Sequence, residues 1–233
     1  MKIIDKLKRM WEKPPSSPEP ESEIPISVAV LEIRAMQFMV QINRIIYDGS
    51  QKSVDTLFSA LDSLSLKPGF RLGLKIAGKT GIGGESCFYT YRGDDALGAA
   101  GYPVPLGKDI FKNVIVEHSA MGVWQAYLLY ISPTIMPTWW HGCYSNRKFF
   151  FARMNYKGVI TDCIGREVEI EQSQIPQPTV EMRDGKAVVS CPYWNDWKGL
   201  VLETVDIEFK SDGTVALTPH SKVLYKYDCG VCL

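Results

Sequence analysis

The chain has 233 residues, and its 26 lysines and arginines balance 26 aspartates and glutamates, which gives a formal net charge of zero. With 45% hydrophobic and 22% charged residues, its composition excludes an intrinsically disordered chain, and this length can bury a core without disulfides or metal. No dense basic stripe interleaved with aromatic residues is present in the sequence, so we expect no nucleic-acid partner.

Cysteine usage and the distribution of charge predict a cytoplasmic protein. The six cysteines are scattered, and the sequence has no Asn-x-Ser/Thr acceptor for glycosylation, as is typical of a reducing compartment. Charged residues interrupt residues 1–13, so we expect no secretory signal there. The most apolar stretch, residues 24–47, contains Glu32, Arg34 and Arg44, so we expect no transmembrane segment.

Residues 1–24 are expected to form a tail and a linker ahead of a single globular domain at residues 25–233. Within residues 1–13, apolar side chains share one helical face and basic side chains outnumber acidic ones, which predicts a short basic amphipathic helix. Such a helix either frays or packs on its own domain, or it makes weak contact with a membrane surface or a partner. The Pro, Glu and Ser residues at 14–25 are typical of an extended linker.

Three helices are expected, the first two as an antiparallel pair. Apolar residues recur every three or four positions over residues 28–45, which predicts a long first helix. The same spacing over residues 54–64 predicts a second helix, which the following Pro-Gly pair would stop. A third helix is expected over residues 119–131 and should end before Pro133, because proline disfavours the helical conformation of the residue that precedes it.

Antiparallel strands are expected from the point where the hydrophobic period changes to two. Residues 70–76 and 86–92 alternate apolar and polar side chains on either side of a glycine-rich turn, which predicts a β-hairpin. Asp-Gly pairs at 184–185 and 212–213 predict two more hairpin turns. Later strands are expected at 148–154, 168–171, 179–182, 187–191, 200–209, 214–217 and 223–227. Early helices and late strands predict an α+β fold, with helices packed on a mostly antiparallel sheet.

The segment from Gly73 to Thr80 matches the phosphate-binding loop pattern G-x-x-x-x-G-K-[ST]. That loop needs a turn between a strand and a helix, so that backbone N–H groups converge on phosphate. Here the intervening residues alternate as a strand does, and the glycines that follow Thr80 disfavour a helix. We therefore interpret the segment as part of the hairpin and expect no cofactor.

A cysteine-nucleophile hydrolase with a histidine base is the alternative function that the sequence leaves open. The candidate nucleophiles are Cys87 and Cys143, and the candidate bases are His118, His141 and His220. Cys87 lies in an expected strand and Cys143 lies outside every expected helix, so neither gains the helix dipole that lowers a thiol pKa. The sequence therefore favours structural cysteines over an enzyme.

Cys229 and Cys232 have the spacing of half a structural zinc site. A complete site needs two further ligands, and the sequence contains no second C-x-x-C pair. We expect a reduced pair of cysteines and no bound metal.

Two aromatic clusters are the strongest candidates for a binding site. Both are expected in loops, where tryptophan and tyrosine either fill the core beneath a long loop or form a recognition surface. Polar residues within the clusters need hydrogen-bond partners, so we expect at least one cluster to keep an edge in water. The candidate partner-binding residues are Trp139, Trp140, His141, Tyr144, Trp194 and Trp197. The sequence thus favours a non-enzymatic cytoplasmic binding protein with a protein partner.

Overall fold

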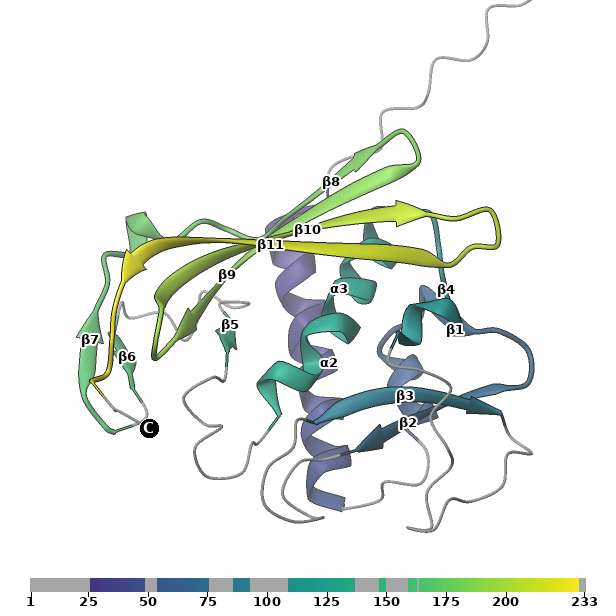
Figure 1. The fold of residues 1–233 in the computed structure, drawn as a ribbon, viewed down its shortest axis with the longest axis horizontal. Coiled ribbons are helices and arrows are strands. Elements are labelled where there is room, and N and C mark those ends of the chain that lie inside the picture. The colour runs from purple at the N-terminus through teal and green to yellow at the C-terminus, as the bar shows by residue number, and fades with distance from the viewer. Residues whose placement is uncertain are drawn as a thin grey trace, which may run out of the picture.

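The computed structural model describes residues 26–48, 54–75, 86–92, 109–136, 147–149, 159–162 and 164–230. Within these ranges, two α-helices, α2 (Val28–Asp48) and α3 (Ala120–Ile135), accompany antiparallel strands that are concentrated in the C-terminal half (Figure 1). The expected α+β class is therefore confirmed, and so is the first helix. The tail and linker at residues 1–24 lie outside the described residues.

The largest sheet has five antiparallel strands, with β11 at one edge and both β8 and β5 paired to β9 at the other. Its strands are β5 (Lys148–Phe149), β8 (Thr179–Arg183), β9 (Lys186–Asn195), β10 (Gly199–Phe209) and β11 (Val215–Lys226). The expected Asp-Gly turns connect β8 to β9 and β10 to β11, where Gly185 and Gly213 adopt φ angles of 66° and 78°. Both predicted hairpin turns are confirmed.

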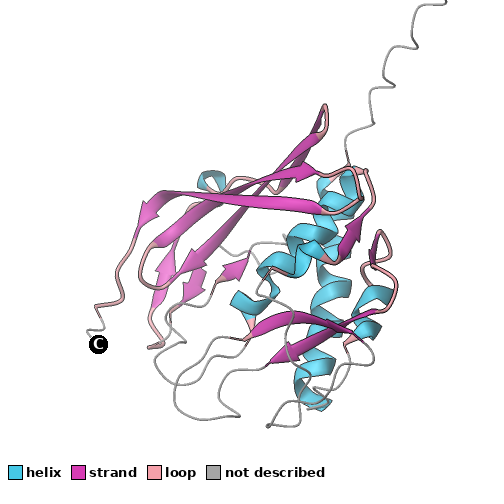
Figure 2. Cartoon of the chain, turned by 45° about the vertical axis from the view of Figure 1, so that its right-hand side comes forward, coloured by secondary structure: helices cyan, strands magenta, loops and turns pink. Residues whose placement is uncertain are grey.

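The main hydrophobic core lies between this sheet and the two helices (Figures 1 and 2). Alternate residues of β9 and β10 face the helices, and the paired Val189 and Val205 are completely buried. α3 is buried at every residue from Gly122 to Leu129, as expected of a helix that packs on several sides. α2 buries one stripe, which includes Leu31 and Phe38. No helix in the described ranges has the length and hydropathy that crossing a bilayer requires.

Three smaller antiparallel sheets have two strands each: β1 (Leu64–Leu66) with β4 (Val114–Val116), β2 (Phe70–Lys75) with β3 (Cys87–Arg92), and β6 (Val159–Thr161) with β7 (Glu167–Glu169). The β2–β3 pair confirms the expected hairpin strands. Gly73 leaves room for the opposite Tyr89, because a Cβ atom there would lie 2.3 Å from Cζ of that ring. The first glycine of the phosphate-loop pattern thus has a packing role, and residues 76–85 lie outside the described residues.

The prediction of a second helix over residues 54–64 is wrong. The chain forms a short 3₁₀ helix, η1 (Asp55–Ser59), and then β1, which pairs with β4. The Gln125 side chain of α3 holds the connecting turn, because it accepts the Ser63 N–H at 2.7 Å and donates to Asp62 at 2.6 Å. Serine, threonine and aspartate side chains also compete with a helical backbone for hydrogen bonds, so tertiary contacts decide the local structure.

The expected end of the third helix before Pro133 is also wrong, because α3 continues through Pro133 to Ile135. Proline has no N–H to donate to the carbonyl four residues earlier, which belongs to Leu129. The Ser132 hydroxyl donates to that carbonyl at 2.6 Å and replaces the missing hydrogen bond. The start of the helix agrees with the expectation, since Ser119 accepts the Gly122 N–H as its N-cap.

Two further 3₁₀ helices, η2 (Ile110–Lys112) and η5 (Gln172–Gln174), lie in the connections. The expected strand at 148–154 is described only as β5, and its later residues lie outside the described ranges. The strand expected at 187–191 is longer than expected and continues to Asn195. This extension determines how the second aromatic cluster is placed.

Candidate interaction surface

The second aromatic cluster lies at the end of a strand and in the tight turn that follows it, which corrects the expectation of a loop. Tyr193, Trp194 and Asn195 pair with β10, so their side chains alternate between the two faces of the sheet. Trp194 is completely buried, whereas Trp197 in the turn is 37% exposed. This cluster therefore keeps an exposed edge at Trp197, as expected for at least one of the two. Trp139, Trp140, His141 and Tyr144 of the first cluster lie outside the described residues.

Trp194 anchors a second, smaller hydrophobic cluster beneath the β6–β7 pair. Its ring lies 5.0 Å from that of Tyr227, and its Nε1–H donates to Oδ1 of Asp196 at 2.6 Å. The other buried members of this cluster are Ile160, Val168, Ile170 and Leu200. Trp194 thus packs the end of β9 against the β6–β7 pair, on the face of the sheet that lies opposite the helices.

Buried polar contacts fix the turn that carries Trp197. Asp196 is 1% exposed, and the Lys148 ammonium lies 3.3 Å from its carboxylate. The Asn195 side-chain oxygen accepts the backbone N–H groups of Trp197 and Lys198. The turn is therefore held in one conformation by hydrogen bonds that solvent cannot easily replace.

Gly199 brings the end of β11 against this turn. Its φ angle is 90°, and a Cβ atom there would lie 2.0 Å from the backbone oxygen of Tyr225, so only glycine fits. The Tyr227 N–H donates to the Lys198 carbonyl, and the Cys229 N–H donates to that of Asp196. The chain after β11 consequently runs beside the turn.

A third segment, the turn between β6 and β7, joins the same end of the sheet through Asp162. The Asp162 side chain is fully buried, and its carboxylate accepts from Nε of Arg166 at 2.8 Å and from the Tyr227 hydroxyl at 2.8 Å. The Arg166 guanidinium also donates to the Cys229 carbonyl. Burial alone would raise the pKa of Asp162, but the Arg166 backbone N–H, the Tyr227 hydroxyl and the Arg166 guanidinium together lower it to about 2.

Replacing Asp162 with Asn is expected to change the acid stability of the protein. A carboxylate whose pKa falls from 3.8 unfolded to about 2 folded stabilises the native state above pH 4, and that stability is lost as pH falls through 2. The free energies of unfolding of wild type and Asp162→Asn should therefore differ most at pH 7 and converge toward pH 2. Urea titrations across this range measure both, and a difference that stays constant would contradict this role.

These three joined segments carry exposed apolar and basic residues, and we call this set of residues the distal surface. Its exposed fractions include 51% at Ile164, 37% at Trp197 and 41% at Tyr225. Its members are Ile164, Arg166, Trp197, Lys198, Lys222, Val223, Leu224, Tyr225 and Lys226, all exposed. Four of the nine are cationic and none is acidic; Glu167 and Asp228 follow them in the chain. Figure 1 shows the end of β11 above the β6–β7 pair, with the β6–β7 turn near the C-terminus.

The edge of β11 is protected against pairing with another strand. Residues 218–226 are exposed on both faces of this edge strand. Pro219 lacks an N–H group, Lys222 and Lys226 add charge, and a register shift opposite Leu200 and Val201 interrupts the ladder. All three features discourage edge-to-edge association. The distal surface therefore offers side chains, and not a free ladder of backbone groups, to a partner.

A buried ion pair lies on the helix-facing side of the same sheet. Glu203 at the centre of β10 is 2% exposed and pairs with Arg147 at 2.5 Å, and it accepts from the Tyr127 hydroxyl at 3.3 Å. The Arg147 guanidinium also lies 4.7 Å above the ring of Tyr193. Burial raises the pKa of the neighbouring Cys191 thiol well above its ordinary value, so this cysteine is unsuited to act as a nucleophile. The cluster links α3 to β9, to β10 and to Arg147, the residue before β5.

The alternative of a cysteine hydrolase requires an imidazole beside an exposed thiol. The described residues contain no such pair. Cys87 is exposed on β3. The His118 ring packs on Phe209 at 4.3 Å, and His220 lies 3.2 Å from Asp206. Cys143 and His141 fall outside the described ranges.

The proposed zinc half-site is only partly described. Cys229 is buried, and Cys232 lies outside the described residues. Within the ranges that the structure describes, no three His, Cys, Asp or Glu side chains are grouped to hold a metal ion.

Comparison of the chain with protein-family models, curated proteins and solved structures finds no match.

Sequence reasoning identified Trp197 but missed Ile164, Arg166 and the end of β11. One signal was present in the last of these: Val223, Leu224 and Tyr225 are three consecutive apolar residues between lysines, which breaks the alternation of a half-buried strand. Nothing in the sequence indicated that the β6–β7 turn would lie beside them. That proximity depends on the contacts of Tyr227 and Cys229.

α2 carries another exposed apolar group on the side opposite its buried stripe. Val30, Ile33, Met36 and Val40 are each at least 40% exposed and recur at helical spacing. These residues are aliphatic, whereas binding hot spots are enriched in Trp, Tyr and Arg. The distal surface, which contains all three types, is the stronger candidate for an interaction site.

Proposed function

We propose that this protein is a non-enzymatic cytoplasmic binding protein that holds an acidic, partly apolar segment of a partner protein on its distal surface. The observation that carries the proposal is the exposed Trp197 together with the exposed Val223–Leu224–Tyr225 run. The turn of Trp197 and the chain that follows this run are joined by backbone hydrogen bonds. Contiguous exposed apolar groups rimmed by polar residues are typical of protein interaction sites. The scattered cysteines and the lack of an Asn-x-Ser/Thr acceptor in the sequence support the cytoplasmic assignment.

The charge of the distal surface selects the partner. Arg166, Lys198, Lys222 and Lys226 surround the apolar residues, so a complementary segment carries aspartate or glutamate beside aromatic or aliphatic side chains. Such complementarity raises the association rate and excludes basic competitors. Exposed cations also make the association sensitive to salt.

The buried contacts beneath the distal surface order its turns before a partner binds, which favours high affinity. Trp194, Asp196 and Asp162 are buried and hydrogen-bonded, so the turns that carry Trp197 and Arg166 are ordered before a partner arrives. A site that is ordered in advance loses less conformational entropy on binding.

Selection of a displayed random peptide library on the full chain tests this function. We expect enriched peptides to combine acidic with aromatic or aliphatic residues. Trp197→Ala and Tyr225→Ala should each weaken binding of a selected synthetic peptide about tenfold or more, because each removes a central anchor. Peptide affinity is measured by fluorescence anisotropy, with the variants first checked for unchanged melting temperature.

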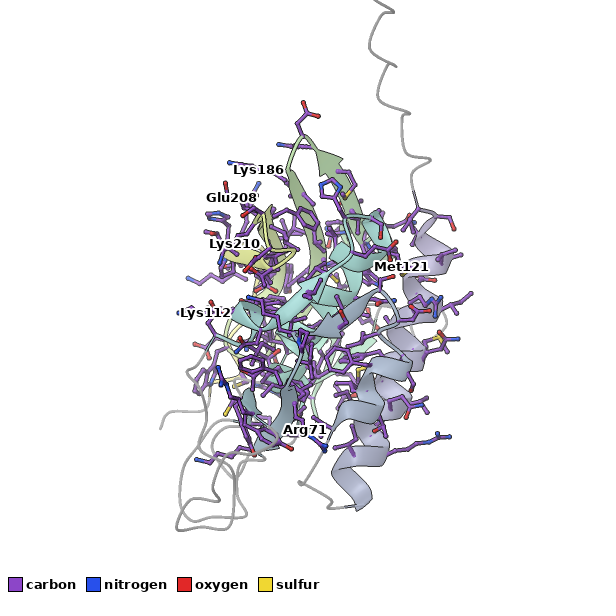
Figure 3. The ribbon with its side chains drawn as sticks, turned by 90° about the vertical axis from the view of Figure 1, so that its right-hand side faces the viewer. Arg71, Lys112, Met121, Lys186, Glu208 and Lys210 are labelled. Carbon is purple, nitrogen blue, oxygen red and sulfur yellow. The ribbon has the colours of Figure 1, made fainter. Side chains whose placement is uncertain are left out.

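Charge reversal provides the matched control for this experiment. Lys222→Glu within the surface should weaken the same peptide, whereas Lys210→Glu at the opposite end of the sheet, labelled in Figure 3, should leave its affinity unchanged. Peptides that bind equally well to wild type, Trp197→Ala and Lys222→Glu would refute the assignment of this surface. A selection without enrichment would refute it as well.

A further inference from the structure

A cavity of about 380 Å³ lies away from the distal surface, between the C-terminal half of α3 and the start of β11. Four elements supply its walls: β3, η2, α3 and β11. The volume falls in the range of small-molecule sites, at its lower end. The lining residues are Cys87, Phe88, Asp109, Ile110, Phe111, Leu129, Tyr130, Pro133, Ala216 and Leu217.

Apolar surface makes up somewhat more of the cavity walls than polar surface does. Phe88, Phe111 and Tyr130 contribute aromatic rings, and Leu129 and Leu217 contribute aliphatic surface. An apolar body is therefore the part of a ligand that these walls would bury. Cavities that combine such walls with a small number of placed polar groups are the usual form of a small-molecule site.

Asp109 has the single formally charged side chain among the described residues that line the cavity. It is placed by the start of η2, where it is the N-cap and its Oδ1 accepts the Phe111 N–H at 3.0 Å. This hydrogen bond holds the exposed Asp109 side chain in one orientation at the start of η2. The remaining polar groups are the Cys87 thiol and the Tyr130 hydroxyl, which are formally neutral.

We propose that this cavity binds a small organic cation, an ammonium group on an aromatic or aliphatic body, with Asp109 as the counter-ion. A carboxylate and aromatic rings both attract a cation, and the apolar walls contact the rest of the molecule. An anionic ligand of the same shape would meet the Asp109 charge with no cationic side chain among the described lining residues to offset it. This site is independent of the distal surface and of the function proposed for it.

Titration of the full-length protein with phenethylamine tests the proposal. Isothermal calorimetry should give saturable binding, and the backbone amide signals of Ala216 and Leu217 should shift in NMR spectra. Phenylacetate, which has the same ring and the opposite charge, should bind at least tenfold more weakly. Equal affinities for the two compounds, or no saturable binding of phenethylamine, would overturn the proposal.

Two substitutions separate a charge-selective site from general adsorption. Asp109→Asn removes the charge and keeps an N-cap acceptor, so the fold should be preserved while the dissociation constant for phenethylamine rises at least tenfold. Asp184→Asn, in the β8–β9 turn, is the matched control and should leave the constant unchanged. Ala216→Leu, which fills the cavity, should also abolish binding. If neither Asp109→Asn nor Ala216→Leu changed the dissociation constant for phenethylamine, the compound would bind outside this cavity, and the proposal would be refuted.

Discussion

Trp194→Ala is expected to lower the free energy of unfolding by about 3 to 5 kcal/mol, the range for large aromatic truncations in a core. Trp194 is completely buried, packs on Tyr227, and is the largest member of the cluster that closes the sheet beneath β6 and β7. Its removal leaves a cavity and also takes the Nε1–H donor away from buried Asp196. Urea unfolding followed by circular dichroism measures the loss.

Trp197 provides the control within the same turn. Its side chain is 37% exposed, so Trp197→Ala should change stability far less than Trp194→Ala does. Trp194→Phe separates packing from hydrogen bonding, since it keeps most of the apolar volume and removes the donor to Asp196. Similar losses from Trp194→Ala and Trp197→Ala would show that the two side chains do not differ in burial as described.

These two tryptophans also show where prediction from the sequence ends. Their aromatic chemistry made the segment a candidate binding site, but the segment was expected to be a loop. The structure instead extends β9 through Asn195, because pairing with β10 and β5 satisfies its backbone. Whether an aromatic side chain faces the core or solvent then depends on strand register, because a shift of one residue moves every side chain to the other face of the sheet.

Local signals predicted the fold well where one element determines its own structure. The stripe of α2 and the Asp-Gly turns depend on neighbouring residues, and both agree with the structure. Prediction was wrong where a distant side chain decides: Gln125 holds the turn before β1, 62 positions away from its Ser63 partner. The distal surface belongs to this second class, since its three segments meet only through tertiary contacts.

Arg147→Ala is expected to destabilise the protein by about 3 to 5 kcal/mol, because it leaves the Glu203 carboxylate buried without its cation. The two partners are not equivalent. The Glu203 side chain is 2% exposed, whereas that of Arg147 is 23% exposed and stacks on Tyr193. The remaining hydrogen bond from the Tyr127 hydroxyl, at 3.3 Å, cannot neutralise the charge that stays behind.

Removing the carboxylate instead should cost less than removing the arginine. In Glu203→Leu, the guanidinium of Arg147 can turn toward solvent, and leucine keeps apolar volume between α3 and the sheet. The double variant Arg147→Met with Glu203→Leu should recover most of the stability that Arg147→Ala loses, because a buried ion pair contributes little net stability beyond that of packed apolar side chains. Denaturant titrations of all three variants decide the point. Equal losses in Arg147→Ala and Glu203→Leu would mean that both charges are equally dependent on the pair, which contradicts the difference in exposure.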